Sequence, residues 1–210
     1  MSVCFPDPVV RRLPMYYRYL KRLENEGTAF VTSTALAEMT GLTASQVRQD
    51  VNTFGGAGRQ GSGYPVSEMR EYIGKLLGID KQQTMAIIGM GNLGRAIAGY
   101  EPFSQTSFTA IAAFDADPQK IGRRVGNLVV WSVEELESFL EHTHVDIAVL
   151  TLPAAHAQEM SRRLYDCGIR GFWNFAPVDL QLPRGTAVVN VHLDASLEQL
   201  SYRLANPGIW

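Results

Sequence analysis

The sequence predicts an α/β fold in which a small helical unit precedes a doubly wound parallel sheet. From residue 84 onward, apolar runs of strand length alternate with helical stretches, which is typical of a parallel sheet covered by helices on both faces. A glycine-rich turn joins the first of these runs to a helix. Before residue 55, by contrast, the pattern is mainly helical, and glycines end the helices. We therefore expect domains at 1–80 and 84–191, followed by a C-terminal helix and tail at 192–210.

Composition limits the classes of protein to which this chain can belong. Of its 210 residues, 46% are apolar, which is enough for the core of one large domain or two small ones. The formal net charge of −2 indicates no overall preference for nucleic acid, so such binding would need a local basic patch. Cys4 and Cys167 belong to no C-x-x-C motif or histidine cluster, and no signal-peptide core or membrane-length apolar run is present. We expect a cytoplasmic protein that holds no metal and binds no membrane.

The N-terminal domain has the pattern of a winged helix-turn-helix. A short helix ends at Gly41, and Thr43 caps the next helix, which is the arrangement of a helix-turn-helix. The glycine-rich segment 55–64 then suits a β-hairpin with an exposed tip, which would form the wing. A flexible glycine- and serine-rich linker is the alternative. The expected helices occupy residues 9–26, 34–39, 44–54 and 66–77.

The second domain is expected to build one parallel sheet. Ser132 and Glu135 form a capping box at the start of one of its helices. In such a sheet, ligands bind in the crevice beyond the carboxyl ends of the strands. The expected strands occupy residues 85–88, 109–114, 128–131, 145–152, 169–174 and 187–191, and longer helices follow at 132–140 and 154–167.

A Gly89-x-Gly91-x-x-Gly94 motif lies between the first strand and its helix, which is the order of the Rossmann dinucleotide-binding fingerprint. Gly89 permits the tight turn, Gly91 lets the backbone approach a pyrophosphate, and Gly94 lets the helix pack closely on the strand. The residues expected at the pyrophosphate are Gly89, Met90, Gly91, Asn92, Leu93 and Gly94.

The second part of the fingerprint is an acidic residue at the end of the second strand. Asp115 follows an apolar run about 20 residues past the glycines, where a carboxylate binds the adenosine ribose. Its charge would repel a 2′-phosphate, so NAD(H) is favoured over NADP(H). In the alternative interpretation, Asp115 only caps the turn before Pro118. Further cofactor contacts, toward the nicotinamide, are expected at Pro153, Asn174, Phe175, Ala176 and Pro177.

The last helix repeats leucine at positions 193, 197, 200 and 204. A stripe of this regularity most often packs into a core. Here it follows the last strand, with no further sheet to cover, so docking on a second subunit is the other interpretation.

Together these features resemble the Rex family of NADH-sensing transcriptional repressors over nearly the whole chain. The resemblance includes the glycine turn, and Asp117 and Pro118 after Asp115. It also rests on Arg12-Leu-Pro-Met-Tyr-Tyr-Arg18, Gln46-Val-Arg48 with Asp50, Phe54-Gly55, Gly58, Gly61, Gly63-Tyr64, Tyr100 and Asn174-Phe-Ala-Pro177.

The resemblance implies a homodimer in which the C-terminal helix swaps between subunits and two winged domains read a palindromic operator. It implies that NADH releases the DNA, and that NAD+ competes for the same site without driving release. It also implies that Arg18, Tyr100 and the residue at position 192 form the contact that senses the redox state.

Several positions differ from the family pattern. The family usually has a lysine at Gln49, a second basic residue or an aromatic near Ala57 and Gln60, and an aspartate at His192. A histidine could still hydrogen-bond Tyr100 and change its charge near neutral pH, or it could be a tolerated substitution. A paralogue with weak or altered DNA binding is therefore one alternative.

DNA binding would use the N-terminal domain. Arginine and glutamine suit guanine and adenine in the major groove, and Arg48 is the best single candidate. Arg59 on the wing could enter a narrow minor groove. Each of these alone could be an ordinary surface residue, whereas together they favour DNA. The candidates are Arg11, Arg12, Ser45, Gln46, Arg48, Gln49, Arg59 and Gln60.

Two other classes compete with a repressor. An NAD-dependent dehydrogenase would need a substrate pocket and a general acid or base, but the chain leaves no substrate domain, and His142, His144 and His156 form no evident site. We therefore expect no enzyme and no catalytic residue. The third class is a CoA- or NAD-binding module whose N-terminal domain contacts a protein.

Overall fold

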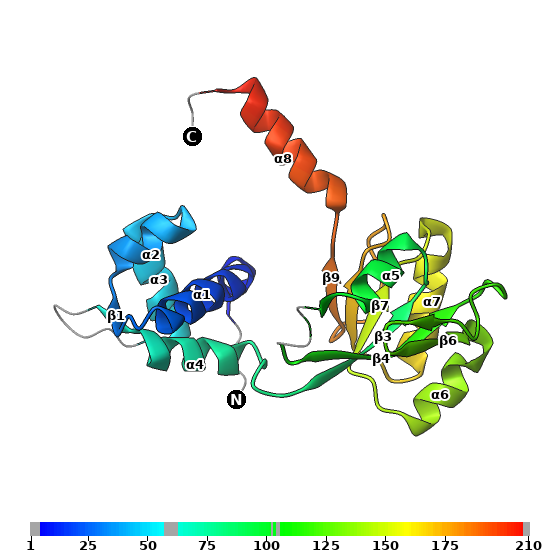
Figure 1. The fold of residues 1–210 in the computed structure, drawn as a ribbon. Coiled ribbons are helices and arrows are strands. Elements are labelled where there is room, and N and C mark those ends of the chain that lie inside the picture. Colours follow the sequence, from blue (N-terminus) through cyan, green and yellow to red (C-terminus); the bar gives the residue numbers. More distant parts are fainter. Residues whose placement is uncertain (1–4, 57–62, 102, 104–105, 208–210) are drawn as a thin grey trace. The chain divides into compact units, whose positions relative to one another are not determined.

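The computed structural model describes residues 5–56, 63–101, 103 and 106–207 (Figure 1). The chain divides into two compact units, Met1–Lys81 and Gln82–Trp210, and each is described by itself.

The first unit is a helix-turn-helix between two further helices. Thr32 and Thr43 cap α2 and α3, each accepting a backbone N–H from a residue three positions on, at 3.1 Å. Gly41 ends α2 with a φ of +72°, a left-handed conformation that suits glycine. The elements are α1 (Asp7–Asn25), β1 (Phe30–Val31), α2 (Ser33–Thr40), α3 (Ala44–Phe54), β2 (Tyr64–Pro65) and α4 (Val66–Leu76).

The described strands of this unit form one short antiparallel pair. Tyr64 pairs with Val31, so β2 has a partner strand that lies before α2. Residues 57–62, which include Ala57, Arg59 and Gln60, lie outside the described part of the chain.

The second unit contains the predicted parallel sheet. Its strand order is β5-β6-β4-β3-β7-β8-β9, and only the β5–β6 pair is antiparallel. Without β5, this is the Rossmann order, which reverses at β3 and β7. The strands are β3 (Gln83–Ile88), β4 (Phe108–Asp115), β5 (Arg124–Val125), β6 (Leu128–Ser132), β7 (Ile147–Leu150), β8 (Gly171–Asn174) and β9 (Ala187–Asn190).

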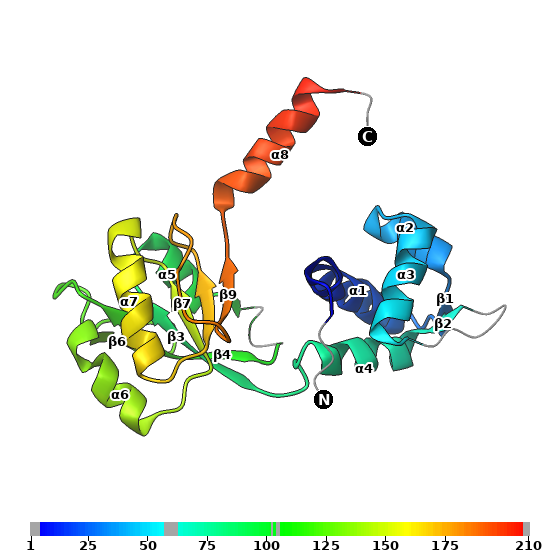
Figure 2. The same cartoon turned by 180° about the vertical axis from the view of Figure 1, so that it is seen from behind.

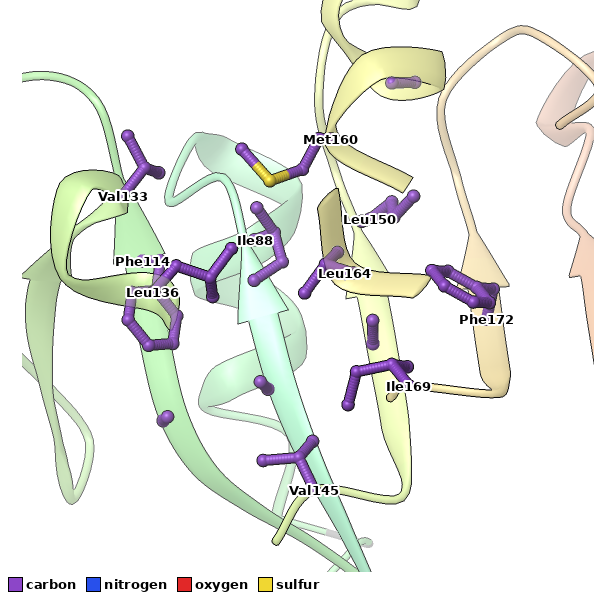
Figure 3. Close-up of a cluster of buried hydrophobic side chains, with 14 of the residues drawn as sticks. Ile88, Phe114, Val133, Leu136, Val145, Leu150, Met160, Leu164, Ile169 and Phe172 are labelled. Carbon is purple, nitrogen blue, oxygen red and sulfur yellow. The ribbon is translucent and has the colours of Figure 1, made fainter. Parts of the chain in front are cut away.

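Helices cover both faces of the sheet, as predicted. Ile88 on β3 packs in one core with Leu136 and Leu164 from the α6 and α7 helices (Figure 3). Ile87, whose side chain points to the opposite face, packs in a second core with Ile97 of α5. The predicted capping box of Ser132 is present at the start of η2. These helical elements are α5 (Asn92–Ala98), η2 (Val133–Glu135), α6 (Leu136–His142) and α7 (Ala154–Asp166).

The last helix, α8 (Leu193–Ala205), extends from the end of β9 and contains no buried residue (Figures 1 and 2). Its four leucines are between 51% and 73% exposed. The stripe therefore does not pack into the core of its own chain. Across the described residues, no helix has the length and apolar content needed to cross a membrane.

Candidate functional site

A cavity of about 840 Å³ opens at the carboxyl ends of the central strands of the second unit. It lies where the strand order reverses, which is the ligand site of open α/β sheets. Of the residues expected to bind a dinucleotide, those that line this cavity are Gly89, Gly91, Asn92, Leu93, Asp115, Pro153 and Phe175.

The three fingerprint glycines meet three different requirements. Gly89 has a φ of +98°, and a methyl group added to it would lie 2.8 Å from the carbonyl oxygen of Thr151. A methyl group added to Gly94 would collide with the carbonyl oxygen of Gly89, so Gly94 allows α5 to pack against the turn. A methyl group at Gly91 would meet no protein atom within 4 Å. The open space at Gly91 is the space that a pyrophosphate would need.

Asp115 is held rigidly at the end of β4, with 7% of its surface exposed. Its Oδ2 accepts hydrogen bonds from the Met90 N–H at 2.6 Å and from Lys120 Nζ at 3.1 Å. Its Oδ1 accepts one from the Asp117 N–H at 2.8 Å. Burial alone would raise the pKa of Asp115, but these hydrogen bonds and the Lys120 charge outweigh it and lower that pKa. A carboxylate has about four acceptor positions, so an ionised Asp115 retains one for a ribose hydroxyl.

Asn174 has a structural role in the loop after β8. It is completely buried, and its Nδ2 donates to the carbonyl oxygen of Val178 at 2.7 Å and to Asn190 Oδ1 at 2.9 Å. Its Oδ1 accepts the N–H of Ala176 at 3.1 Å. These bonds fix the loop so that Phe175 lies on the cavity wall. The predicted residues that do not line the cavity are Met90 and Ala176, both buried, and Gly94, Asn174 and Pro177.

Several polar residues of the cavity wall were not among the predicted site residues. Lys120 is one, and its position five residues after Asp115 was a signal that could have identified it. Asp117 and Thr151 also line the wall, as do His156, Glu159 and Arg163 of α7, of which Arg163 is paired with Glu137. Their spacing along α7 places His156, Glu159 and Arg163 on one side of that helix. No group of three or more His, Cys, Asp or Glu side chains suited to a metal ion occurs in the described segments.

In the first unit, a buried carboxylate joins α1 to α3. Asp50 is 1% exposed and accepts hydrogen bonds from Arg12 Nε at 2.6 Å and Arg12 Nη2 at 2.7 Å. It also accepts one from the Tyr16 hydroxyl and one from Gln46 Nε2, both at 2.8 Å. Burial alone would raise the pKa of Asp50, but these hydrogen bonds outweigh it and lower that pKa. Arg12 and Gln46, both expected at DNA, therefore also fix the orientation of α3.

The outer face of α3 is exposed at Ser45, Arg48 and Gln49. Arg48 Nη1 donates to Ser33 Oγ at 3.1 Å. On α1, Arg11 is exposed and forms an ion pair with Asp7. The positions of these side chains are compatible with DNA contact, which remains a prediction for each of them.

The N-terminal and central parts of the chain match two family models. Residues 5–52 match one described as "Putative DNA-binding protein N-terminus", and residues 80–178 match one described as "CoA binding domain". A redox-sensing transcriptional repressor Rex from Clostridioides difficile (strain 630) is 46% identical over 194 residues, which are 92% of each chain. The chain belongs to the Rex family. The predicted resemblance is thus confirmed, and the dehydrogenase alternative is excluded because the relatives are transcription regulators.

Solved Rex structures confirm the fold. The Rex-family repressor RSP in complex with β-NAD+ and operator DNA has a TM-score of 0.90 to this chain, with 42% identity. The match covers 97% of this chain and 94% of that one. RSP in complex with β-NADH has a TM-score of 0.87, with 40% identity, and the match covers 97% and 95% of the two chains.

The three residues that the Rex resemblance assigns to redox sensing occupy separate elements. Arg18 is exposed on α1, and Tyr100 is exposed after α5, with its ring 5.0 Å from that of Phe103. His192 precedes α8, and its Nε2 lies 3.1 Å from Asp179 Oδ1. In the described part of this Rex chain, the polar partner of His192 is therefore Asp179. A sensing role for the three residues stays a prediction.

Proposed function

We propose that this chain is an NADH-sensing transcriptional repressor that binds palindromic operator DNA and releases it when NADH binds. The Rex relative RSP forms complexes with β-NADH and with β-NAD+ and operator DNA, which supports both ligands for this chain. Because Rex relatives are transcriptional repressors, we place the protein in the cytoplasm, where bacterial DNA is accessible.

The observation that supports this most directly is the pairing of Gly91 with Asp115 across one cavity. Gly91 leaves room for a pyrophosphate, and Asp115 has one acceptor left for the adenosine ribose. The negative charge of Asp115 disfavours a 2′-phosphate, so the ligand is NAD(H). Leu93, Pro153 and Phe175 supply apolar wall beside these groups.

The helix-turn-helix provides the DNA-binding half. A recognition helix enters the major groove and presents its outer face to the bases. Thr43 caps helix α3, and the hydrogen bond between Asp50 and Arg12 connects α3 to α1. These contacts fix the orientation of the outer face of α3.

A homodimer completes the repressor. The exposed leucine stripe of α8 would be covered by a second copy, and an exchanged helix is the form that we propose. Two copies related by a two-fold axis would present two α3 helices to the two halves of a palindrome.

NADH acts in this proposal by shifting a population between DNA-binding and released states. A ligand can shift such an equilibrium only by its difference in affinity for the two states. NADH must therefore bind the released state more tightly, whereas NAD+ binds both states more equally.

Fluorescence anisotropy of the labelled RSP operator duplex tests this function. We expect binding that NADH reverses and that NAD+ reverses poorly. Gly91→Ala is the matched variant, because its methyl group meets no protein atom but occupies the space of the pyrophosphate. It should keep DNA binding and lose release by NADH. Sequence-specific DNA binding that NADH does not change would refute the sensing proposal. If the protein binds NADH but shows no sequence-specific DNA binding, the paralogue with altered DNA binding is favoured.

A further inference from the structure

The outer face of α3 presents two carboxamides that sequence reasoning did not pair, those of Gln49 and Asn52. Both side chains are exposed. They lie three residues apart, so they are neighbours on one side of the helix. With Ser45, Arg48 and Thr53 they line a shallow groove of about 520 Å³.

Three other polar side chains of α3 already form hydrogen bonds within the protein. Gln46 donates to Asp50 at 2.8 Å, and Arg48 donates to Ser33 at 3.1 Å. The Thr53 hydroxyl donates to the backbone carbonyl oxygen of Gln49 at 2.8 Å. Within the described ranges, the amide groups of Gln49 and Asn52 have no hydrogen-bond partner. They are therefore available to a ligand without breaking a bond inside the protein.

A carboxamide is the side-chain group that best matches adenine in the major groove. Its oxygen accepts from the N6 amino group while its nitrogen donates to N7, and Asn and Gln both make this bidentate contact. Residues three apart on a helix are separated by about 4.5 Å along its axis. Base pairs are separated by about 3.4 Å along the duplex. The two amides can therefore address neighbouring base pairs.

We propose that Gln49 and Asn52 read two neighbouring A·T pairs in each operator half-site, and this rests on the proposed repressor function. The carboxamide of Gln46, in contrast, is bonded to Asp50 and positions α3. Because both amides are uncharged, they contribute to discrimination between sequences and not to the salt dependence of binding, which arises from phosphate neutralisation.

The test is fluorescence anisotropy of the full-length protein on the RSP operator and on duplexes in which each A·T pair of both half-sites is changed, one position at a time, to G·C. Gln49→Ala and Asn52→Ala should each weaken operator binding by about 5- to 150-fold per half-site, as about 1–3 kcal/mol of base discrimination implies. Each variant should also become indifferent to the base pair at one position, and the two positions should be neighbours.

Ser67→Ala is the control, because Ser67 is exposed on α4 and lies outside the α3 groove, so its removal should leave affinity and specificity unchanged. All three sites are exposed, so circular dichroism should show unchanged helix content. The dependence of DNA affinity on salt concentration should also be unchanged in Gln49→Ala and Asn52→Ala. Arg11→Ala should reduce the slope of log affinity against log salt concentration by about 1 if Arg11 contacts a phosphate.

Three outcomes overturn the proposal in distinguishable ways. If the wild-type protein binds the RSP operator no more tightly than a scrambled duplex, the proposed repressor function fails as well. If the wild-type protein discriminates and both variants keep its pattern, only the amide readout fails. If the variants weaken binding equally on every duplex, the two side chains contact the backbone and not the bases.

Discussion

Replacing Asp50 with asparagine should selectively destabilise the N-terminal unit. The change keeps the size of the side chain but removes the charge that accepts four hydrogen bonds. It also places an amide donor against the donors of Arg12. Breaking a buried ion pair costs about 3–5 kcal/mol. The Arg12 side chain is 23% exposed and can recover some hydration, so we expect the lower end, about 3 kcal/mol.

Two spectroscopic probes separate the units in a urea titration. Tryptophan fluorescence reports the second unit, because Trp131, Trp173 and Trp210 all follow residue 81. Far-UV circular dichroism reports the helices of both. With m values of about 1–3 kcal/mol per M, Asp50→Asn should lower the midpoint of the N-terminal transition by at least about 1 M. The fluorescence transition should not move.

Asp7→Asn is the matched control, since it breaks an exposed ion pair on the same helix. Its effect should stay within about 1 kcal/mol. If Asp50→Asn behaves like this control, the buried network does not hold α1 to α3. Equal shifts of both probes would show that the two units unfold together and would refute the selective effect.

Other consequences follow for the second unit. Gly94→Ala should destabilise it by at least about 2 kcal/mol, because the added methyl group collides with the backbone of Gly89. An unchanged urea midpoint in tryptophan fluorescence would contradict the packing at this turn. Asp115→Asn removes the charge that disfavours a 2′-phosphate, so it should reduce the ratio of NADH affinity to NADPH affinity in fluorescence titrations. An unchanged ratio of the two affinities would place the carboxylate away from the ribose. Because the folded-state pKa of Asp115 is lowered, its stabilising effect is present above about pH 4 and is lost as pH falls through that pKa. The free energy of unfolding, measured by tryptophan fluorescence, should therefore fall less steeply with decreasing pH in Asp115→Asn. Leu197→Glu with Leu200→Glu should give a folded monomer in sedimentation, since both leucines are exposed in the single chain; a persistent dimer would exclude α8 as the interface.

Local patterns predicted the elements that carry the site. The bounds of α3 agree with the expected helix at 44–54, because a threonine cap and a left-handed glycine define both ends. The glycine turn and Asp115 were also predictable, since strand, turn and helix follow one another directly in the chain.

Long-range pairings were not predictable. Asp50 bonds Arg12 across 38 residues, so the sequence alone gave no reason to bury a carboxylate in α3. Strand β1 has two residues, too few for an alternating pattern, and its pairing with β2 was missed. The strand expected at 145–152 spans only Ile147–Leu150, and residues 151 and 152 lie beyond its end and line the cavity.

The most direct test of the account is a thermodynamic cycle between the two ligands. The affinity for NADH is measured from NADH fluorescence, with and without saturating operator DNA. The affinity for operator DNA is measured by fluorescence anisotropy, with and without saturating NADH. Coupling between sites is reciprocal, so the account predicts that operator DNA weakens NADH binding by the factor by which NADH weakens operator binding. An NADH affinity that operator DNA leaves unchanged would contradict the central claim that this chain senses NADH through its hold on DNA.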